Sequence, residues 1–136
     1  MSDNPAAAAA ANLAAVRRYV DAWLAGDFPG MMATYADGFV LHWFGDNPFA
    51  KTMRGKAEAI GALTEFTRRT DRKLAGVVDV MAGPERATVI VREQLTIGGA
   101  TRVVERVLVY RVEDGLLAEC WVYDQDQRLI DQALSA

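Results

Sequence analysis

The fold of this chain is decided by residues 86–124, which read RATVIVREQLTIGGATRVVERVLVYRVEDGLLAECWVYD. Hydrophobic and polar residues alternate through much of this stretch, and β-branched residues are frequent, which is typical of strands in a sheet. The pair Gly98–Gly99 suits a tight reversal, and Asp114–Gly115 supplies the positive φ angles that a two-residue hairpin requires. The stretch therefore predicts consecutive antiparallel strands over residues 86–97, 101–113 and 116–124.

The segments beside this stretch extend the sheet and close the chain. Residues 73–82 predict one more strand, joined to the next by the turn Gly83-Pro84-Glu85. After the last strand, Asp126 can cap a short terminal helix over residues 127–134. The two longest strands need a bulge or a strong twist, and a sheet bent in this way can enclose a cavity.

The N-terminal half of the chain predicts helices and a single early strand. Apolar residues recur with helical spacing in three segments, over residues 12–25, 27–37 and 56–70. Asn12 and Asp27 are the potential N-caps of the first two helices. The aromatic and β-branched run FVLHWF, residues 39–44, predicts a strand between the second and third helices.

Length and composition indicate one ordinary globular domain. The chain has 136 residues, of which 51% are hydrophobic, and a formal net charge of −3. This length predicts one domain, over residues 12–136. Residues 1–11, which end in an alanine run, are expected to form a flexible arm whose last turns can extend the first helix. Because the charge balance offers no polycationic surface, nucleic acid is not expected as a partner.

Cys120 is the only cysteine, which excludes an internal disulfide bond and a cysteine-based metal cluster. We therefore expect a reducing, cytoplasmic setting. Residues 1–11 lack the basic and apolar regions of a signal peptide and are too short in apolar length for a membrane span. A membrane is consequently not expected as a partner.

Three local motifs and the order of the elements carry a resemblance to a known superfamily. The motifs are VRRYVDAWLAGD (16–27) with YAD (35–37), HWFGDNP (42–48) with Arg54-Gly55, and DQDQ (124–127) with Leu129 and Asp131. The first resembles the opening of ketosteroid isomerase, and the other two resemble bacterial SnoaL-like proteins, all within the nuclear transport factor 2-like superfamily. The resemblance implies an α+β, cone-shaped fold in which three N-terminal helices pack in a strongly curved, mainly antiparallel sheet around an apolar pocket.

The match to ketosteroid isomerase itself is incomplete. That enzyme abstracts a proton with an aspartate on its first strand, at the position where this chain has Trp43. Its oxyanion hole combines a tyrosine of the first helix, matched by Tyr19, with a protonated aspartic acid on a late strand, where this chain has Leu108. The base and half of the oxyanion hole are thus absent. Steroid-type enolisation by that arrangement is not expected, whereas other acid–base reactions in the same pocket remain open.

The two long strands leave two alternatives for the residues that face the pocket. Side chains alternate along a strand, so Arg92 and Glu93 point to opposite faces, as do Glu105 and Arg106. The hydrophobic pattern does not choose between these faces. The resemblance implies an inward face that carries Arg92, Gln94, Arg106, Tyr110, Cys120, Val122 and Asp124. A bulge would reverse this choice, and both registers stay open.

Asp124, His42 and Tyr19 are the candidate catalytic residues. SnoaL-like cyclases use an aspartate on the last strand, which implies an acid–base role for Asp124; the alternative is a salt bridge to an arginine or a helix cap. His42 is the only histidine and can titrate near physiological pH, but it can equally be a structural residue whose ring bonds to the backbone. Tyr19 can donate a hydrogen bond to a ligand oxygen.

The candidate ligand-binding residues are Arg92, Trp23, Trp43, Tyr110 and Arg106. Trp23 lies one helical turn after Tyr19, so both can reach the same wall of the pocket, although packing is an alternative role for the tryptophan. One histidine with scattered carboxylates lacks a metal-ligand spacing, and no glycine-rich phosphate loop is present. No metal and no cofactor are expected.

These residues support competing functional hypotheses. The leading one is a cofactor-independent isomerase, cyclase, lyase or epoxide hydrolase that acts on a hydrophobic small molecule by acid–base chemistry. The alternatives are a noncatalytic ligand-binding module and a protein-interaction module of the same fold. Either strand register leaves Val, Leu and Ile side chains outside the pocket, which predicts a homodimer through the outer face of the sheet.

Overall fold

A computed structural model describes residues 4–135, which form one six-stranded sheet and four helices. The helices are α1 (Pro5–Leu24), α2 (Phe28–Ala33), α3 (Lys56–Thr70) and α4 (Gln127–Leu134). The strands are β1 (Tyr35–Trp43), β2 (Thr52–Arg54), β3 (Lys73–Ala82), β4 (Ala87–Ile97), β5 (Ala100–Glu113) and β6 (Leu116–Asp124). They lie in the order β2-β1-β6-β5-β4-β3 across the sheet.

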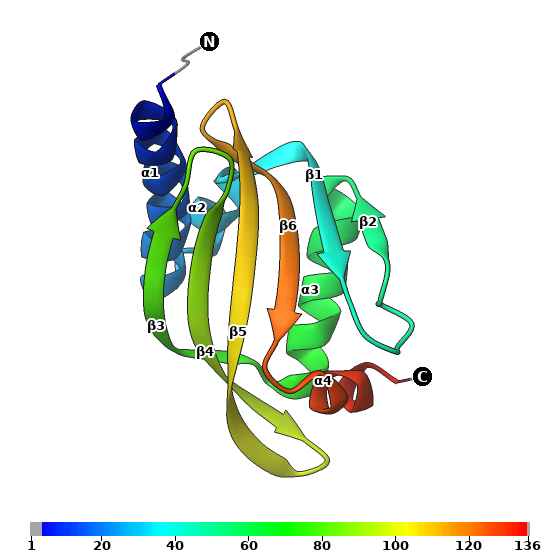
Figure 1. Ribbon diagram of the computed structural model, residues 1–136. Coiled ribbons are helices and arrows are strands. Elements are labelled where there is room, and N and C mark those ends of the chain that lie inside the picture. Colours follow the sequence, from blue (N-terminus) through cyan, green and yellow to red (C-terminus); the bar gives the residue numbers. More distant parts are fainter. Residues whose placement is uncertain (1–3, 136) are drawn as a thin grey trace.

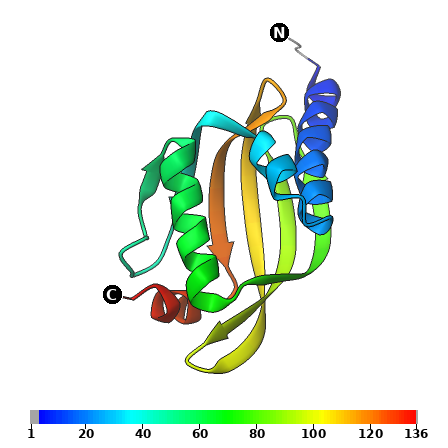
Figure 2. The ribbon, with the colours of Figure 1, turned by 180° about the vertical axis from the view of Figure 1, so that it is seen from behind.

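The sheet is strongly curved, and the helices lie on one side of it (Figure 1). Seen from behind, α1, α2 and α3 cover the concave face, while α4 lies beyond the end of β6 (Figure 2). The predicted α+β fold is therefore confirmed, and β1 lies between the second and third helices as predicted. The short strand β2 was not predicted from the sequence.

Antiparallel pairing holds throughout the sheet except between β1 and β6, which run parallel. The two predicted tight turns are present: Gly98, Gly99, Asp114 and Gly115 all have positive φ angles. The β4–β5 pairing contains no irregularity, whereas β3 and β6 contain register shifts. The bulges of this sheet thus lie in its other strands, and the regular β4–β5 pairing decides between the two registers that the sequence left open.

The first helix begins earlier than predicted. The Asn4 side chain caps α1 by accepting hydrogen bonds from the backbone N–H groups of Ala6 and Ala7. Asn12, the expected cap, is instead buried within the helix, and its amide donates to the carbonyl oxygens of Gly83 and Pro84 in the β3–β4 turn. Most of the predicted flexible arm is therefore helical, and residues 1–3 lie outside the described residues.

The second helix is shorter than predicted, and as a result Tyr35 lies in a strand and not in the helix. Helix α2 ends at Ala33, where the Thr34 hydroxyl donates to the Met31 carbonyl oxygen. The Thr34 carbonyl then accepts from the backbone N–H of Leu117 in β6, which starts the pairing of β1 with that strand. Tyr35, which was expected in the helix, therefore begins β1 and is buried.

The loop after β1 is fastened to the terminal helix. The Asp131 carboxylate of α4 accepts hydrogen bonds from the Asp46 backbone, the Asn47 amide and the Gln127 amide. Gln127 also donates to the carbonyl oxygen of Phe44. Burial opposes ionisation of Asp131, yet the three hydrogen bonds hold its pKa below the ordinary value. Two of the quoted sequence motifs therefore meet in one hydrogen-bonded group of residues, which we call the joint: Phe44, Asp46, Asn47, Gln127 and Asp131. Asp126 caps α4 as predicted.

Candidate functional site

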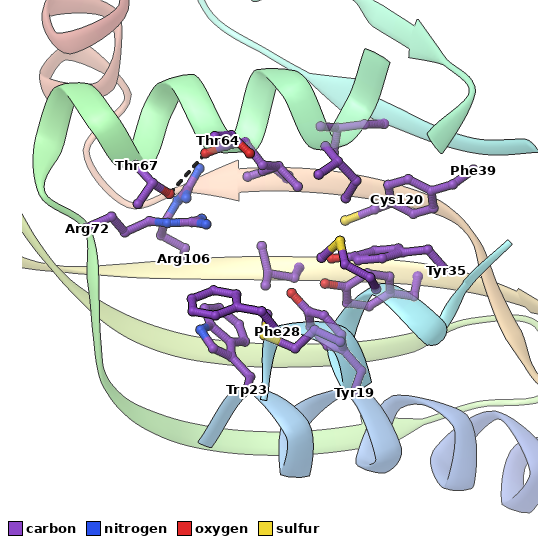
Figure 3. A pocket seen from close by; sticks show the side chains of 18 residues that line it. Tyr19, Trp23, Phe28, Tyr35, Phe39, Thr64, Thr67, Arg72, Arg106 and Cys120 are labelled. Carbon is purple, nitrogen blue, oxygen red and sulfur yellow. Dashed lines mark hydrogen bonds between the residues drawn. The ribbon is translucent and has the colours of Figure 1, made fainter. Parts of the chain in front are cut away.

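A cavity of about 380 Å³ lies between the concave face of the sheet and helices α1, α2 and α3. Apolar side chains form most of its wall, among them Phe39, Leu41, Leu108 and Val122 from the strands and Met31 from α2. The close view in Figure 3 shows two polar regions set into this wall. One is formed by tyrosines from α1, β1 and β5, and the other by arginines and threonines near the end of α3.

Tyr19, Tyr35 and Tyr110 form the tyrosine group, and all three are buried. The Tyr19 ring contacts the other two, with its centroid 5.5 Å from that of Tyr35 in an edge-on arrangement and 5.7 Å from that of Tyr110 in a tilted one. Burial raises the pKa of Tyr19, an effect that hydrogen bonds with Tyr35 and Tyr110 partly offset. Burial raises the pKa of Tyr35 and of Tyr110 well above the ordinary tyrosine value. All three hydroxyl groups therefore stay protonated at neutral pH.

A count of protons shows what the tyrosine group can offer a ligand. Three phenol groups carry three hydroxyl protons, and two bonds to Tyr19 use two of them. At least one O–H group is left without a tyrosine acceptor. The neighbouring Cys120 sulfur, which contacts Tyr110, is only a weak acceptor. The group can thus offer a hydroxyl proton to an oxygen atom of a ligand in the cavity.

Arg106 is the centre of the second polar region. Its guanidinium is buried and donates to both oxygens of Asp124, from Nε at 2.5 Å and from Nη2 at 3.4 Å. A second carboxylate, that of Glu93, lies 3.5 Å from Nη1. Burial alone would lower the pKa of Arg106, but the charges of Glu93 and Asp124 outweigh it and raise that pKa. Arg106 therefore remains charged and is held by its two partners.

Aromatic rings pack around the same guanidinium. Its central carbon lies 4.8 Å from the ring centre of Phe66 and 5.6 Å from that of Trp43. Such cation–π contacts add to the ion pairs and exclude water from them. Trp43 itself does not line the cavity, and it packs edge-on against Phe66. The predicted role of Trp43 as a ligand contact is therefore wrong. Trp43 instead packs against Arg106, which does line the cavity.

The rim of the cavity is formed by side chains that solvent still reaches. Phe28 at the start of α2 is 69% exposed, and Trp23, Met32, Ile60 and Leu63 are half-buried. In Figure 3 the Phe28 ring lies beside Trp23, below the arginines. The entrance thus lies between α3 on one side and α1 with α2 on the other.

The family model of the SnoaL-like domain matches residues 16–120, most of the chain. The chain belongs to the SnoaL-like domain family. No curated protein matches it.

Solved structures share the fold of this SnoaL-like domain. A nuclear transport factor 2-like protein from Burkholderia xenovorans superposes with a TM-score of 0.73 at 20% identity, covering 93% of this chain and 98% of the other. A putative SnoaL-like polyketide cyclase from Mesorhizobium loti gives 0.68 at 18%, covering 80% and 95%. TerC co-crystallised with polyporic acid gives 0.72 at 16%, covering 88% and 98%. At these identities the likeness shows the fold alone. Together with the family match, this fold confirms the superfamily expected from the motifs.

The structure of this SnoaL-like domain brings four of the candidate residues to the cavity. Tyr19, Trp23, Tyr110 and Arg106 all line it. Asp124 does not line it, although its side chain is only 1% exposed, because both of its oxygens face Arg106. Of the two roles weighed for Asp124, the structure therefore shows the salt bridge.

Arg92 points away from the cavity, so the inward orientation expected for it is wrong. Its side chain is 59% exposed on the convex face, where it pairs with Glu105 at 3.6 Å. The neighbouring Glu93 takes the inward position, because the regular β4–β5 pairing sets Val91 beside Arg106 and Arg92 beside Glu105. The sequence-based choice of register was thus correct for β5 and wrong for β4.

His42 also lies outside the cavity. Leu41 and Trp43 are buried on the inner face of β1, and alternation turns His42 to the convex face. There its Nε2 lies 2.5 Å from Glu119, its Nδ1 lies 2.9 Å from the Thr52 hydroxyl, and its ring stacks on Trp121. A role for His42 as the acid or base of the cavity is therefore excluded by its position.

Sequence reasoning missed three residues of the site. Glu93 and Arg72 belong to the charged region, and Tyr35 belongs to the tyrosine group. Among residues 4–135 no group of His, Cys, Asp and Glu side chains could hold a metal ion. Within the same range, no helix combines the length and the apolar character needed to cross a membrane.

Proposed function

We propose that this SnoaL-like domain binds a small, mainly apolar molecule in the cavity and that the tyrosine group donates a hydrogen bond to an oxygen of that molecule. The single observation that carries the proposal is the combination of apolar walls with a buried, protonated group of three tyrosines. Ligand sites for drug-sized molecules commonly have this composition and volumes from about 300 Å³ upwards.

The chemistry of the molecule follows from the two kinds of wall. Displacing water from apolar side chains favours an apolar ligand, with roughly 25 cal/mol gained for each Å² removed from water. A ligand without an acceptor would leave a buried tyrosine O–H unsatisfied, which costs about 1–3 kcal/mol. Ketones, quinones, esters and phenols with an aromatic or alicyclic body therefore fit better than hydrocarbons. TerC, co-crystallised with polyporic acid, gives a precedent for a small-molecule complex in this fold.

An experiment with a matched pair of ligands tests this proposal. N-phenyl-1-naphthylamine, which fluoresces when it enters an apolar site, reports occupancy, and 2-acetonaphthone competes with 2-ethylnaphthalene, which has the same shape without the oxygen. We expect the wild type to prefer the ketone by about tenfold, in line with the cost of an unsatisfied buried donor. Because Tyr19→Phe alone would free the hydroxyl groups of Tyr35 and Tyr110, the test uses the variant Tyr19→Phe/Tyr35→Phe/Tyr110→Phe, which leaves no hydroxyl in the group and should lose this preference.

Two further variants on one helix locate the binding site. Ile60→Trp places a large ring at the rim of the cavity and should abolish probe binding. Ala57→Trp adds the same ring at an exposed position of α3 that does not line the cavity and should leave binding unchanged. Equal binding by both variants would contradict the proposal, as would a wild type that binds no probe.

A second candidate is the acid–base enzyme of the isomerase, cyclase or lyase type. The observation that favours it is again the tyrosine group, because a protonated phenol in a water-excluded cavity stabilises the oxyanion that forms when a carbonyl compound enolises. No Asp, Glu or His side chain is among the described residues that line the cavity. A base would therefore have to come from water or from Glu93 after movement of the arginines.

Proton exchange tests the catalytic candidate separately from binding. If the domain promotes enolisation, the methyl protons of bound 2-acetonaphthone should exchange in D₂O faster than in free solution, as measured by NMR. The same triple tyrosine-to-phenylalanine variant should reduce the enzyme-dependent rate by a factor on the order of 10² or more, the loss seen when an oxyanion donor is removed. Binding without any accelerated exchange would leave the noncatalytic binding function and reject the enzyme.

A further inference from the structure

Arg72 differs from the other arginine of the cavity in the number of its partners. Arg106 donates to Asp124 and contacts Glu93, so its guanidinium is held on both sides. Arg72 contacts Glu93 through Nε at 3.4 Å, and among residues 4–135 its Nη nitrogens make no hydrogen bond with the protein. Two guanidinium nitrogens that line the cavity are thus available to a ligand.

Arg72 stands where the chain leaves α3, at the rim of the cavity. Its side chain is 19% exposed, between the buried Arg106 and solvent. Figure 3 shows its guanidinium reaching into the cavity at the end where Thr64 and Thr67 lie, away from Tyr35. The Thr67 hydroxyl donates to the Leu63 carbonyl. Thr64 also lines the cavity but is exposed to solvent, and its hydroxyl has no hydrogen-bond partner within the described part of the chain. A charged donor and a free hydroxyl therefore stand at the same end of the cavity.

A ligand that fills the cavity would displace the water that now reaches these donors. Donors deprived of water must find an acceptor, because leaving them unsatisfied costs more than the contact gains. A guanidinium presents two Nη–H groups side by side, a geometry that matches the two oxygens of a carboxylate. A planar monoanion is therefore the acceptor that fits best.

We propose that Arg72, with Thr64, binds a carboxylate at the rim of the cavity, so that the ligands of this domain are acids with an apolar body between the carboxylate and an oxygen that faces the tyrosine group. This inference rests on the proposed function, since it assumes that the cavity holds a ligand. It adds the charge of the ligand and its orientation: the carboxylate at the rim and the neutral oxygen deep in the cavity.

The charges around Arg72 set the size of the expected effect. Arg72 and Arg106 carry two positive charges and Glu93 and Asp124 carry two negative charges, so the group is neutral as a whole. A ligand carboxylate therefore gains from charge-assisted hydrogen bonds with Arg72 more than from net attraction. At the rim it also keeps part of its hydration, which limits its desolvation cost. Such bonds are about twice as strong as neutral ones, which predicts a preference of about tenfold for an acid over its amide.

Competition against N-phenyl-1-naphthylamine measures this preference directly. The competitors are 2-naphthylacetic acid and 2-naphthylacetamide at pH 7, which have the same size and differ in charge. The wild type should bind the acid about tenfold more tightly than the amide. Arg72→Gln should reduce this ratio to nearly one, and Thr64→Val should reduce it about threefold. Arg92→Gln removes an exposed arginine on the convex face and should leave the ratio unchanged.

The outcomes separate this inference from the proposed function. Probe binding with an acid-to-amide ratio near one in the wild type would overturn the carboxylate site and leave the binding function intact. A wild type that binds no probe would overturn both. Arg72→Gln leaves Glu93 with Arg106 as its only partner and could therefore prevent folding. The double variant Arg72→Gln/Glu93→Gln keeps the local charge balanced, and it should show the same loss of the preference for the acid. Loss of the preference in Arg92→Gln as well would also reject the assignment.

Discussion

Replacing Asp124 with Asn tests whether the charged region is held together as the structure indicates. The substitution keeps the shape of the side chain and removes one negative charge from a pair in which both side chains are 1% exposed. An amide can accept from Arg106 with its oxygen, but its NH₂ group would then face a second guanidinium donor. The stability of the fold should suffer, whether or not a ligand is bound.

The magnitude follows from what remains around Arg106. After the substitution Arg72 and Arg106 share Glu93 alone, at 3.4 Å and 3.5 Å, and one positive charge stays uncompensated in the core. Removing one partner of a buried ion pair typically costs about 3–5 kcal/mol. Because Glu93 stays in place, we expect the lower end, about 3 kcal/mol. For a domain of this size that corresponds to a fall in Tm of roughly 10 °C.

Urea denaturation followed by tryptophan fluorescence measures this change, because Trp43 packs against Arg106 and reports on the region. The matched control is Glu105→Gln, which breaks the ion pair with Arg92 on the convex face, where both side chains are exposed. That control should change stability by no more than about 0.5 kcal/mol. A loss below about 1 kcal/mol in Asp124→Asn, combined with weaker ligand binding, would refute the structural assignment and return Asp124 to a role facing the ligand.

Other features give sharp expectations of their own. Gly45→Ala should lower the free energy of unfolding by about 2 kcal/mol in the same denaturation assay. The reason is that Gly45 has a φ of 115° and that a Cβ atom there would overlap the Asp131 carboxylate. An unchanged urea midpoint would contradict the proposed contact between this loop and α4. Burial raises the pKa of Cys120 to about 12, so its thiol should resist a disulfide reagent at pH 8 in the folded protein and react after denaturation; rapid reaction before denaturation would show that the thiol is accessible. A homodimer through the convex sheet face, where Val103 and Tyr123 are exposed, should give twice the mass of one chain in light scattering at micromolar concentration, whereas a monomer would reject it.

Much of the fold could be predicted from the sequence because its signals are local. Residues 73–82 and 116–124 form the predicted strands, and residues 127–134 form the predicted terminal helix, since turn dipeptides and caps bound each of them. The shortened α2 could not be predicted in the same way. Its end depends on the pairing of the Thr34 carbonyl with Leu117, more than 80 residues away in the chain.

The correct orientation of Arg92 could have been inferred from the sequence. Across a two-residue turn at Gly98–Gly99, Ile97 pairs with Ala100, and counting back along both strands places Arg92 opposite Glu105. Paired residues share a face, so Arg92 and Arg106 cannot both point inward in a hairpin without a bulge. Applying that count identifies Glu93 as the inward residue of β4.

For Asp124 the same counting method, applied from the turn, gives the wrong orientation. The same count across Asp114–Gly115 pairs Arg106 with Tyr123 and turns Asp124 outward. In the structure β6 contains a register shift after Leu117, where Leu117 and Ala118 are both buried, and Asp124 pairs with Arg106 instead. Nothing in the local sequence demands this bulge. The ion pair at the cavity therefore depends on a feature set by tertiary packing.

Two of the three motifs that carry the family resemblance do not supply the residues that give the cavity its chemistry. HWFGDNP and DQDQ supply Phe44, Asp46, Asn47 and Gln127 to the joint with α4, which fixes the loop after β1 and the C-terminal helix. Their one histidine faces away from the cavity. The first motif supplies Tyr19 and Tyr35 to the cavity. The other polar groups that would select a ligand come from β5, from α3 and from Arg72, the residue that follows the capping Asp71. Because these positions lie outside the joint, the HWFGDNP and DQDQ motifs do not determine them. Within such a family the ligand must therefore be inferred from the cavity of each chain.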